Sequence, residues 1–358
     1  MSSDKSPTVK TPAPKIAKDF RCGTVALLGR PNAGKSTLLN ALLDVAVSAT
    51  SNRPQTTRHN IRGIVQIEEG KGTRKTWKGQ LVLIDTPGVN LKKGQPLERA
   101  MLMSVEEAIT DVDIVVWVAD SRTFDKDLRD FELEKQGTDK ALGWLRKQLK
   151  ALGDAPASKG KSAVKGPRWV LVLSKADLTP KLELLPLIQR AAKLLPEFAD
   201  IVPVAATFGG EHSKSNVDAL IKILKDAAPL GEPAYSEDDW TDLSERQLVA
   251  NLVREAIFQL CYEEVPYESD CSIIRFLEPE GKKKMAEVDA TIWVGKKSLK
   301  PIVVGNKGAM IREINHRVRE RYKEITGEGL VLRLLVKVVE NWHSVPKQLA
   351  ELGYGHGK

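Results

Sequence analysis

The segment from Gly29 to Ser36, which reads GRPNAGKS, limits the possible folds of this chain more than any other feature. It matches the pattern G-x-x-x-x-G-K-[ST], follows the apolar run Thr24–Leu28 and precedes a helical pattern that begins at Lys35. Strand, glycine-rich loop and helix in this order form a phosphate-binding loop, because the loop N–H groups gather at the positive end of the helix. We therefore expect a nucleotide-binding α/β domain.

Short β-branched runs alternate with helical patterns from Thr24 to Ala228, which predicts a doubly wound, mostly parallel sheet. The predicted strands are Thr24–Leu28, Leu81–Ile84, Ile114–Ala119, Trp169–Leu173 and Ile201–Val204. The predicted helices are Lys35–Leu43, Glu98–Ile109, Lys140–Leu152, Leu182–Leu195 and Asn216–Asp226. Two polar stretches without periodic apolar positions, Glu68–Lys78 and Asp154–Pro167, are expected to be loops or a hairpin extension.

A length of 358 residues exceeds what one hydrophobic core usually organises, so about two domains are expected. We predict a disordered tail over residues 1–19, the nucleotide domain over 20–230, a linker over 231–240 and a smaller α+β domain over 241–358. The second domain is predicted to contain the helix Thr241–Leu260, strands at Ser272–Leu277, Met285–Val294 and Leu330–Val339, and a basic helix from Ala309 to about Ile325. Three cysteines without a CxxC pair indicate a reducing compartment.

The positive charge is concentrated in the second domain. Between Lys282 and Lys323 there are twelve basic and four acidic residues, a local charge of +8 that equals the net charge of the whole chain. Such a field favours a polyanionic partner, although a solvated charged face has the same composition.

The phosphate site is predicted residue by residue. Lys35 brings a cation to the β- and γ-phosphates, and the Ser36 hydroxyl is placed to bind Mg²⁺. Asp85 ends an apolar strand and is expected to hold Mg²⁺ through water, while the N–H of Gly88 meets the γ-phosphate. The predicted phosphate and metal set is Gly29, Arg30, Pro31, Asn32, Ala33, Gly34, Lys35, Ser36, Thr37, Asp85, Thr86, Pro87, Gly88 and Val89.

The polar segment Gln55-Thr56-Thr57-Arg58-His59 lies between these two motifs. A mobile threonine here can complete the Mg²⁺ shell only when the γ-phosphate is present. We expect Thr57 to be that ligand, with Thr56 as the alternative, and an ST-turn as the purely structural explanation.

A base site is predicted after the strand Trp169–Leu173, at Ser174-Lys175-Ala176-Asp177. The Asp177 carboxylate can accept from both N1–H and the 2-amino group of guanine, which adenine cannot offer. Because leaving buried polar groups unpaired is costly, Asp177 is expected to select GTP over ATP. The stem of Lys175 can lie along the base.

The turn Gly305-Asn306-Lys307-Gly308 precedes the basic helix. A GxxG turn lets a nucleic-acid backbone approach closely, as in KH domains, with Lys307 and the helix N–H groups facing phosphates. We expect RNA to bind there, with Arg312 also in contact. An anionic membrane surface is the rival partner, because lysine patches attract both.

Together, GRPNAGKS, QTTRH, DTPG, SKAD, GNKG and the Leu352-Gly353-Tyr354 tail resemble the Era family of GTPases over residues 20–355. The resemblance implies a type II KH domain, GTP hydrolysis to GDP, binding near the 3′ end of small-subunit ribosomal RNA, assembly of that subunit, and a GTP-driven change in the relation between the domains. It further implies a cytoplasmic monomer that does not bind DNA, or a protein peripheral to the inner face of the cell membrane. A GTPase acting at a membrane or on another RNA, such as transfer RNA, is the alternative.

The chain departs from the family pattern at the base site. Ser174 stands where related GTPases have asparagine, which questions nucleotide affinity, and Ala205 replaces the usual serine of the last motif. The backbone N–H of Ala206 is expected to meet the guanine carbonyl.

The hydrolytic apparatus also differs from that of many small GTPases. Val89 stands where they carry the water-orienting glutamine, and related proteins of this kind hold K⁺ with the residue that corresponds to Asn32. The predicted catalytic set is Asn32, Lys35, Thr57 and Gly88.

Overall fold

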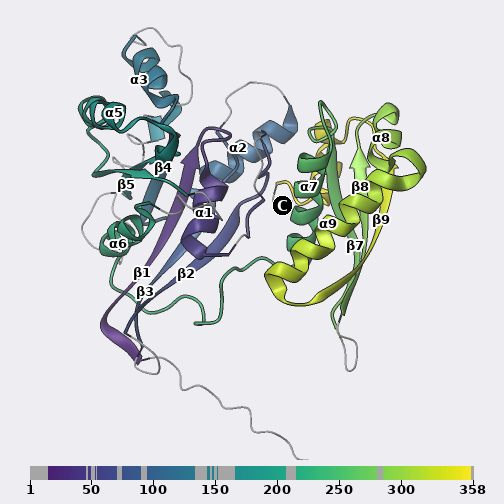
Figure 1. The fold of residues 1–358 in the computed structure, drawn as a ribbon, viewed down its shortest axis with the longest axis horizontal. Helices are drawn as coiled ribbons and strands as arrows, with labels where there is room; N and C mark the ends of the chain where they lie inside the picture. The colour runs from purple at the N-terminus through teal and green to yellow at the C-terminus, as the bar shows by residue number, and fades with distance from the viewer. Residues whose placement is uncertain are drawn as a thin grey trace, which may run out of the picture.

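The computed structural model describes residues 15–45, 47–49, 53, 55–70, 75–89, 95–133, 143–145, 147–148, 151, 166–206, 215–279 and 285–355. Within them, two units that each combine helices and a sheet lie side by side (Figure 1). None of the helices in this part of the chain is long and apolar enough to cross a bilayer.

The first unit is built on a six-stranded sheet of order β2-β3-β1-β4-β5-β6. Neighbouring strands are parallel except β2, which runs antiparallel to β3. This confirms the predicted mostly parallel, doubly wound sheet. The strands are β1 (Lys15–Gly29), β2 (Ile61–Glu69), β3 (Thr76–Asp85), β4 (Ile114–Asp120), β5 (Arg168–Ser174) and β6 (Asp200–Val204).

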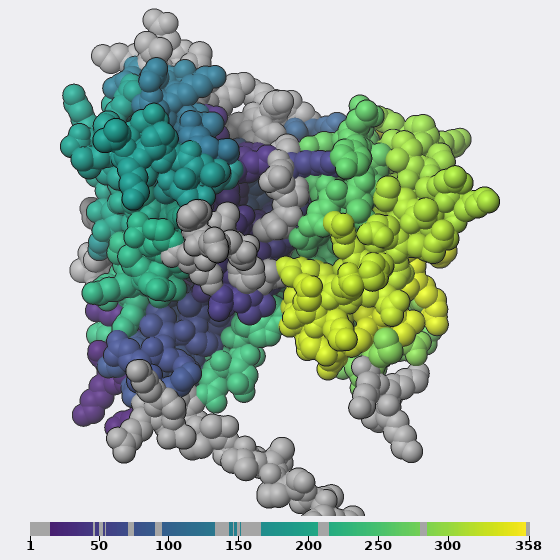
Figure 2. All heavy atoms as spheres, in the orientation of Figure 1, coloured from purple at the N-terminus to yellow at the C-terminus, as the bar shows by residue number. Residues whose placement is uncertain are grey.

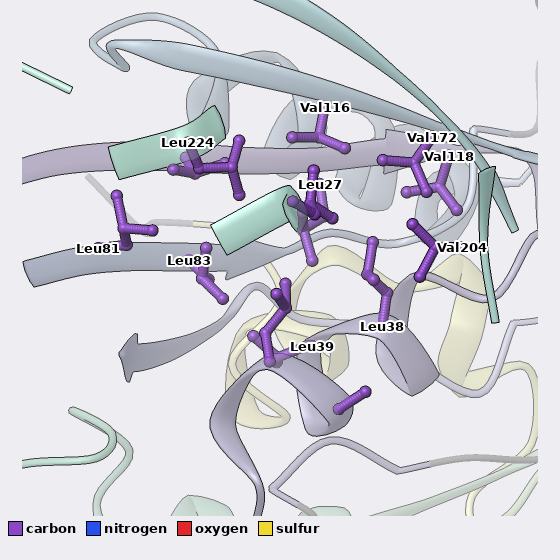
Figure 3. Close-up of a cluster of buried hydrophobic side chains, with 14 of the residues drawn as sticks. Leu27, Leu38, Leu39, Leu81, Leu83, Val116, Val118, Val172, Val204 and Leu224 are labelled. Carbon is purple, nitrogen blue, oxygen red and sulfur yellow. The ribbon is translucent and has the colours of Figure 1, made fainter. Parts of the chain in front are cut away.

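Helices cover both faces of this sheet, which explains why its central strands are apolar on both sides. Alternate residues of β1 enter opposite layers: Leu27 packs toward α1 and α6, and Leu28 packs toward α2, α3 and α5. Figure 3 shows the first of these layers, where Leu38 and Leu39 lie close to Leu27. The helices are α1 (Lys35–Leu43), α2 (Pro96–Ala108), α3 (Phe124–Leu133), α5 (Lys181–Leu194) and α6 (Val217–Ala227), with the short turn η2 (Ala176–Leu178).

The second unit has the order α-β-β-α-α-β. Its sheet has the order β7-β8-β9, in which β7 and β8 are antiparallel and β8 and β9 parallel. Side chains of α7 and α9 pack on this sheet in one core with Ile257, Ile292 and Ile314. The elements are α7 (Glu245–Leu260), β7 (Ser269–Leu277), β8 (Met285–Val294), η3 (Lys297–Leu299), α8 (Lys300–Val304), η4 (Asn306–Gly308), α9 (Ala309–Thr326), β9 (Gly329–Val338), η5 (Trp342–Ser344) and α10 (Pro346–Glu351).

Several predicted boundaries were wrong. β1 begins at Lys15, so residues 15–19 of the predicted tail belong to the sheet, where Lys15 pairs with Thr76 and Phe20 packs on Trp77. The helix expected from Thr241 begins at Glu245, because Ser244 forms a capping box with Gln247 and Thr241 bridges to Gly63 of β2.

Several elements were not expected from the sequence, including the short helices α8 and α10 of the second unit. β2 was missed, and it forms a hairpin with β3 across the Glu68–Lys78 stretch; α3 was missed as well. Of the predicted helix Lys140–Leu152, residues 143–145, 147–148 and 151 are helical. Residues 1–14 and nearly all of the Asp154–Pro167 stretch lie outside the described residues.

The linker over residues 231–240 lies against the first unit. The Gln80 Oε1 atom accepts from the Ala234 and Tyr235 N–H groups at 2.8 and 3.0 Å, and Gln66 Nε2 donates to the Ser236 carbonyl at 2.9 Å. These side-chain bonds hold the linker against the β2–β3 hairpin.

Candidate nucleotide site and nucleic-acid interface

A cavity of about 820 Å³ opens at the carboxyl ends of the parallel strands. Its wall contains the predicted loop residues Arg30–Thr37, together with Gly88, which follows β3, Asp120, which ends β4, and Lys175, which follows β5. The fold thus brings the predicted phosphate loop and Lys175 of the base motif to one cavity, as expected for an open α/β sheet. The predicted base residues Asp177, Ala205 and Ala206 are not among its described lining residues. Gly29 ends β1 just before this wall.

Lys35 lies in the floor of the cavity and is buried. Its ammonium group donates to the carbonyl oxygens of Gly29 and Arg30 at 3.2 and 3.1 Å. Burial lowers the pKa of Lys35 to about 8, partly offset by the carboxylate of Asp85. A buried ammonium group whose hydrogen bonds among the described residues go to loop carbonyls can turn toward phosphate oxygens.

Three hydroxyl groups converge on Asp85. Its Oδ2 accepts from Ser36 at 2.6 Å, from Ser48 at 2.7 Å and from Thr57 at 3.3 Å, and the Ser36 and Thr57 hydroxyls lie 2.8 Å apart. Burial raises the pKa of Asp85, while Lys35 and these hydroxyls oppose the rise.

The other oxygen of Asp85, Oδ1, is buried and has no hydrogen-bond partner among the described residues. A carboxylate with one unsatisfied oxygen, close to the hydroxyls of Ser36 and Thr57, is a donor set suited to Mg²⁺, which binds carboxylate and hydroxyl oxygen and retains several waters. The residues present therefore fit the predicted metal. Ser48, which the sequence analysis missed, is held by reciprocal hydrogen bonds with Asn40 of α1, and no sequence signal marks it.

The segment Gln55–His59, called the switch segment below, contains two threonines whose hydroxyl groups have different partners. Thr57 reaches the Asp85 cluster, whereas the Thr56 hydroxyl donates to the Arg53 carbonyl at 3.0 Å, as in a local turn. The structure thus brings Thr57 to the predicted metal site and Thr56 away from it.

The residues after Asp85 form the opposite wall. The Thr86 hydroxyl donates to the Leu27 carbonyl at 2.7 Å and fixes the strand ends, and the buried Pro87 leads to Gly88 at the cavity wall. Val89 donates its N–H to the Gly29 carbonyl at 2.9 Å, and its side chain is buried in the core. Val89 therefore cannot orient a water molecule.

The base motif is tied to the phosphate loop. The Ser174 hydroxyl lies 2.5 Å from the Ala33 carbonyl oxygen and 3.1 Å from that of Ala119, and Lys175 Nζ donates to the Asn32 carbonyl and to Asp120 Oδ2, both at 2.8 Å. Serine at this position thus still bridges the two loops.

Asp120 and Arg122 form an ion pair beside this motif that sequence reasoning missed, although the position of Asp120 at the end of a predicted strand could have marked it. Burial alone raises the pKa of Asp120, but hydrogen bonds from Arg122 and Lys175 lower it to about 2. Asp177 is exposed on η2, close enough to Arg122 to help raise its pKa.

The last predicted nucleotide residues, Ala205 and Ala206, directly follow β6 and are buried. β6 pairs with β5 so that Val204 is opposite Ser174, which brings these alanines next to the base motif. The Ala205 N–H bonds to the Ser215 carbonyl at 3.2 Å.

In the second unit, the GxxG turn links α8 to α9. Gly305 has φ 73°, and a Cβ there would lie 2.6 Å from the Met310 nitrogen, so only glycine fits. Lys307 is exposed with φ 47°, and Arg312 Nη1 braces the turn by donating to the Lys307 carbonyl at 2.8 Å. Asn306 and Gly308 complete the turn, and Gly308 caps α9.

A shallow cavity of about 360 Å³ lies between α9 and β9, and its lining begins at Ile311 in the first turn of α9. Asn315 and Arg319 donate to the Leu332 and Leu330 carbonyls at 2.7 and 2.9 Å and so join the helix to the strand. The helical spacing after Arg312 could have identified this face from sequence. The cavity is lined by Ile311, Arg312, Asn315, His316, Arg319 and Leu334.

Comparisons with known proteins agree with this geometry. Residues 24–146 match the sequence profile of the family described as 50S ribosome-binding GTPase, and residues 263–343 match the KH domain. The chain is 34% identical over 340 residues to GTPase Era of Mycobacterium tuberculosis, covering 94% of this chain and 99% of the relative. It is 33% identical over 336 residues to GTPase Era of Trichlorobacter lovleyi, covering 94% and 98%.

Two solved structures resemble the whole chain. An Era variant of Aquifex aeolicus bound to GDP·AlF4⁻ matches with a TM-score of 0.78, and Era in complex with MgGDPNP and nucleotides 1506–1542 of 16S ribosomal RNA matches with 0.75. Each is 30% identical, and each alignment covers 94% of this chain and 100% of the other.

Proposed function

This chain belongs to the Era family of GTPases, and from that premise we propose that it is a GTP-driven switch whose KH domain binds small-subunit ribosomal RNA during assembly of that subunit. The observation that carries the proposal is the convergence of Ser36, Thr57 and Asp85 at one end of a cavity whose other end carries Lys175. The GTPase activity itself follows from the family.

The residues of the cavity have different roles in GTP hydrolysis. Lys35 would bind the β- and γ-phosphates in place of its loop carbonyls. Ser36, Thr57 and Asp85 would hold Mg²⁺, which would neutralise charge that develops on the phosphates. Gly88 approaches the γ-phosphate through its N–H.

The nucleotide half is tested with Lys35→Ala in the full chain. We expect wild-type protein to bind GTP and GDP with Mg²⁺ and to hydrolyse GTP, and the variant to lose at least a hundredfold in affinity or turnover, because one charged contact to phosphate is removed. A wild-type protein that binds neither nucleotide would refute the proposal.

Guanine selection is assigned to Asp177. Asp177→Ala removes both acceptor oxygens, so the preference for GTP over ATP should fall by at least tenfold in a competition assay. Asp200→Ala is the control. Asp200 is the first residue of β6 and its carboxylate bonds to Arg168, so this variant should retain the preference for GTP.

Potassium is proposed to assist hydrolysis beside Asn32, since Val89 is buried and offers no glutamine-like group. Turnover should be several-fold faster in KCl than in NaCl at equal ionic strength, and Asn32→Ala should remove the difference. Equal rates in both salts would remove this part of the proposal.

The RNA half rests on the turn at Gly305–Gly308 and on the solved relative, which was crystallised with a 16S ribosomal RNA fragment. Lys307→Glu should weaken binding to a 3′-terminal small-subunit RNA fragment at least tenfold, because it reverses a charge on the turn. Lys181→Glu reverses an exposed charge on α5 and should change binding less than twofold. Tighter binding of wild-type protein to transfer RNA or to anionic phospholipid vesicles would favour the alternative partner.

A further inference from the structure

The switch segment is anchored in the KH domain by a buried arginine. Arg58 is 1% exposed, and its Nη1 lies 2.9 Å from Asp270 Oδ2 and 2.9 Å from the Ser269 carbonyl oxygen. Its Nη2 donates to the Pro266 carbonyl at 2.9 Å. Every one of these partners belongs to the other domain, more than 200 residues along the chain.

Asp270 is the centre of this contact. It is fully buried at the start of β7, and its Oδ1 accepts from Arg254 at 2.8 and 3.1 Å and from the Cys271 N–H at 2.7 Å. The Tyr354 hydroxyl donates to Oδ2 at 2.5 Å. Burial opposes ionisation, but Arg254 and Arg58 hold the pKa of Asp270 well below its ordinary value, so the carboxylate is charged.

The neighbours of Arg58 are held on the same surface. His59 stacks on Tyr354 with ring centroids 4.2 Å apart, and the Arg53 guanidinium lies 4.7 Å from the ring centroid of Tyr262 and donates to the Cys261 carbonyl. Figure 2 shows purple atoms of the first domain in contact with green atoms of the KH domain across this boundary.

A second contact between the domains is apolar. Leu97 and Met101 of α2 share a buried cluster with Trp342 and Leu349, which follow β9. The switch segment, which contains Thr57, and α2, the first helix after Gly88, therefore both contact the KH domain.

The backbone between Thr57 and Arg58 connects two sites that are fixed separately. The Thr57 hydroxyl enters the cluster around Asp85, whereas the next side chain enters the cluster around Asp270. Removing a buried guanidinium from its carboxylate is strongly unfavourable, so Arg58 has one well-defined position while the domains are docked. Adjacent residues cannot move independently, so this position also restricts Thr57.

We propose that Asp270 of the KH domain is a positioning residue for GTP hydrolysis, because it holds Arg58 and thereby sets the Thr57 hydroxyl beside the metal end of the phosphates. The inference rests on the proposed role of Thr57 as a Mg²⁺ ligand. Docking of the KH domain then stabilises the position of Thr57 that binds GTP with Mg²⁺. By linkage, binding of GTP with Mg²⁺ stabilises the docked KH domain.

The test compares Mg²⁺ dependence in the full-length protein. Arg58→Met removes the guanidinium and leaves Asp270 paired with Arg254 and Tyr354. The Mg²⁺ concentration for half-maximal GTP hydrolysis should rise about tenfold, and affinity for a non-hydrolysable GTP analogue should fall about tenfold. GDP affinity should change less than threefold, because Thr57 binds the metal only when the γ-phosphate is present.

Arg62→Met is the matched control. Arg62 makes an exposed ion pair with Asp242, close to the end of the linker, at 2.9 Å. The substitution therefore also removes one arginine charge, but from a contact that does not involve Asp270. It should leave the Mg²⁺ midpoint within twofold of wild type. Tyr354→Phe keeps every charge and should raise the midpoint about threefold, which provides a test even if Arg58→Met does not fold.

The outcomes separate the inference from the function on which it rests. Wild-type protein that hydrolyses GTP, with Arg58→Met and Tyr354→Phe at the wild-type midpoint, would overturn the role of Asp270 and leave the GTPase intact. A parallel loss of GDP and GTP-analogue affinity would show general loosening of the site and would equally overturn it. Hydrolysis by wild-type protein without any Mg²⁺ requirement would remove the assignment of Thr57 itself.

Discussion

The Ser174 hydroxyl lies between the carbonyl oxygens of Ala33 and Ala119 and so connects the base motif to the phosphate loop. Ser174→Ala removes this connection, and we expect nucleotide affinity to fall about tenfold, equivalent to a loss of about 1.4 kcal/mol, which is typical of one buried hydrogen bond. Titration with a fluorescent GDP analogue measures the change.

Ser272→Ala makes the same chemical change at another buried serine, in β7, whose hydroxyl has no hydrogen-bond partner among the described residues. It should leave GDP affinity within twofold of wild type. Unchanged affinity in Ser174→Ala would mean that the loop is held by its other contacts, such as the bond from Lys175 to the Asn32 carbonyl.

At the residue scale, the sequence predicted residues that belong to short motifs. It did not predict residues whose role depends on a contact with a distant part of the chain. Lys35 and Asp85 were predictable because each follows a strand in a recognisable motif. Arg58 was quoted only as part of a motif, since nothing near it in sequence reveals that Asp270 is its partner. The bond from Ser174 to the phosphate loop likewise depends on the position of β5 beside that loop, which the residues around Ser174 in the sequence do not reveal.

At the element scale, the turn after β3 requires a glycine at 88. A Cβ on Gly88 would lie 2.6 to 2.8 Å from three atoms of Pro31, so Gly88→Ala must push this turn away from the phosphate loop. We expect GTP hydrolysis to slow at least tenfold with GDP affinity within threefold, as measured by phosphate release and nucleotide titration. Gly143→Ala, where a Cβ meets open space, is the control and should retain full turnover.

The first turn of α7 gives a separate prediction about stability. Ser244 accepts from the Gln247 N–H, and the Gln247 side chain accepts from the Ser244 N–H. Ser244→Ala should lower the free energy of unfolding by about 1 kcal/mol, as is usual for an N-cap. Urea denaturation followed by circular dichroism measures it; no shift in midpoint would mean that the packing of α7 alone sets its start.

Elements with strong apolar periodicity were predicted well, and those defined by pairing were not. α1 begins and ends where its pattern predicted, at Lys35 and Leu43. β2 was missed because its sequence, IRGIVQIEE, combines a glycine with charged residues, and its strand form depends on antiparallel pairing with β3. α3 was missed because it is mostly charged and buries only one side, at Phe124 and Leu128.

At the scale of the whole molecule, the two binding surfaces should respond differently to salt. The KH turn and α9 present exposed cations such as Lys307 and Arg312, and α8 lies on the side of the KH domain away from the first domain (Figure 1). About four neutralised phosphates predict a slope near −3 of log affinity against log salt, or about a 50-fold loss between 50 and 200 mM.

Nucleotide affinity should change only a few-fold over the same range, because Lys35 and Asp85 are buried and poorly screened. Fluorescence anisotropy with labelled RNA and with labelled GDP gives both slopes from one preparation. A flat RNA slope would contradict an electrostatic RNA surface.

The attachment of the linker to the β2–β3 edge limits how far the KH domain can travel. Bonds from Gln80 and Gln66, the bridge from Thr241 to Gly63, the Asp242–Arg62 ion pair and the packing of Leu243 on the first core leave Ser244 between these attachments and α7. One extended residue spans about 3.5 Å, so release of both Arg58 and the apolar contact of α2 would let the KH domain turn about Ser244 while it stays close to the first domain. RNA bound at the N-terminal end of α9 would then turn about this pivot and stay at a roughly constant distance from it.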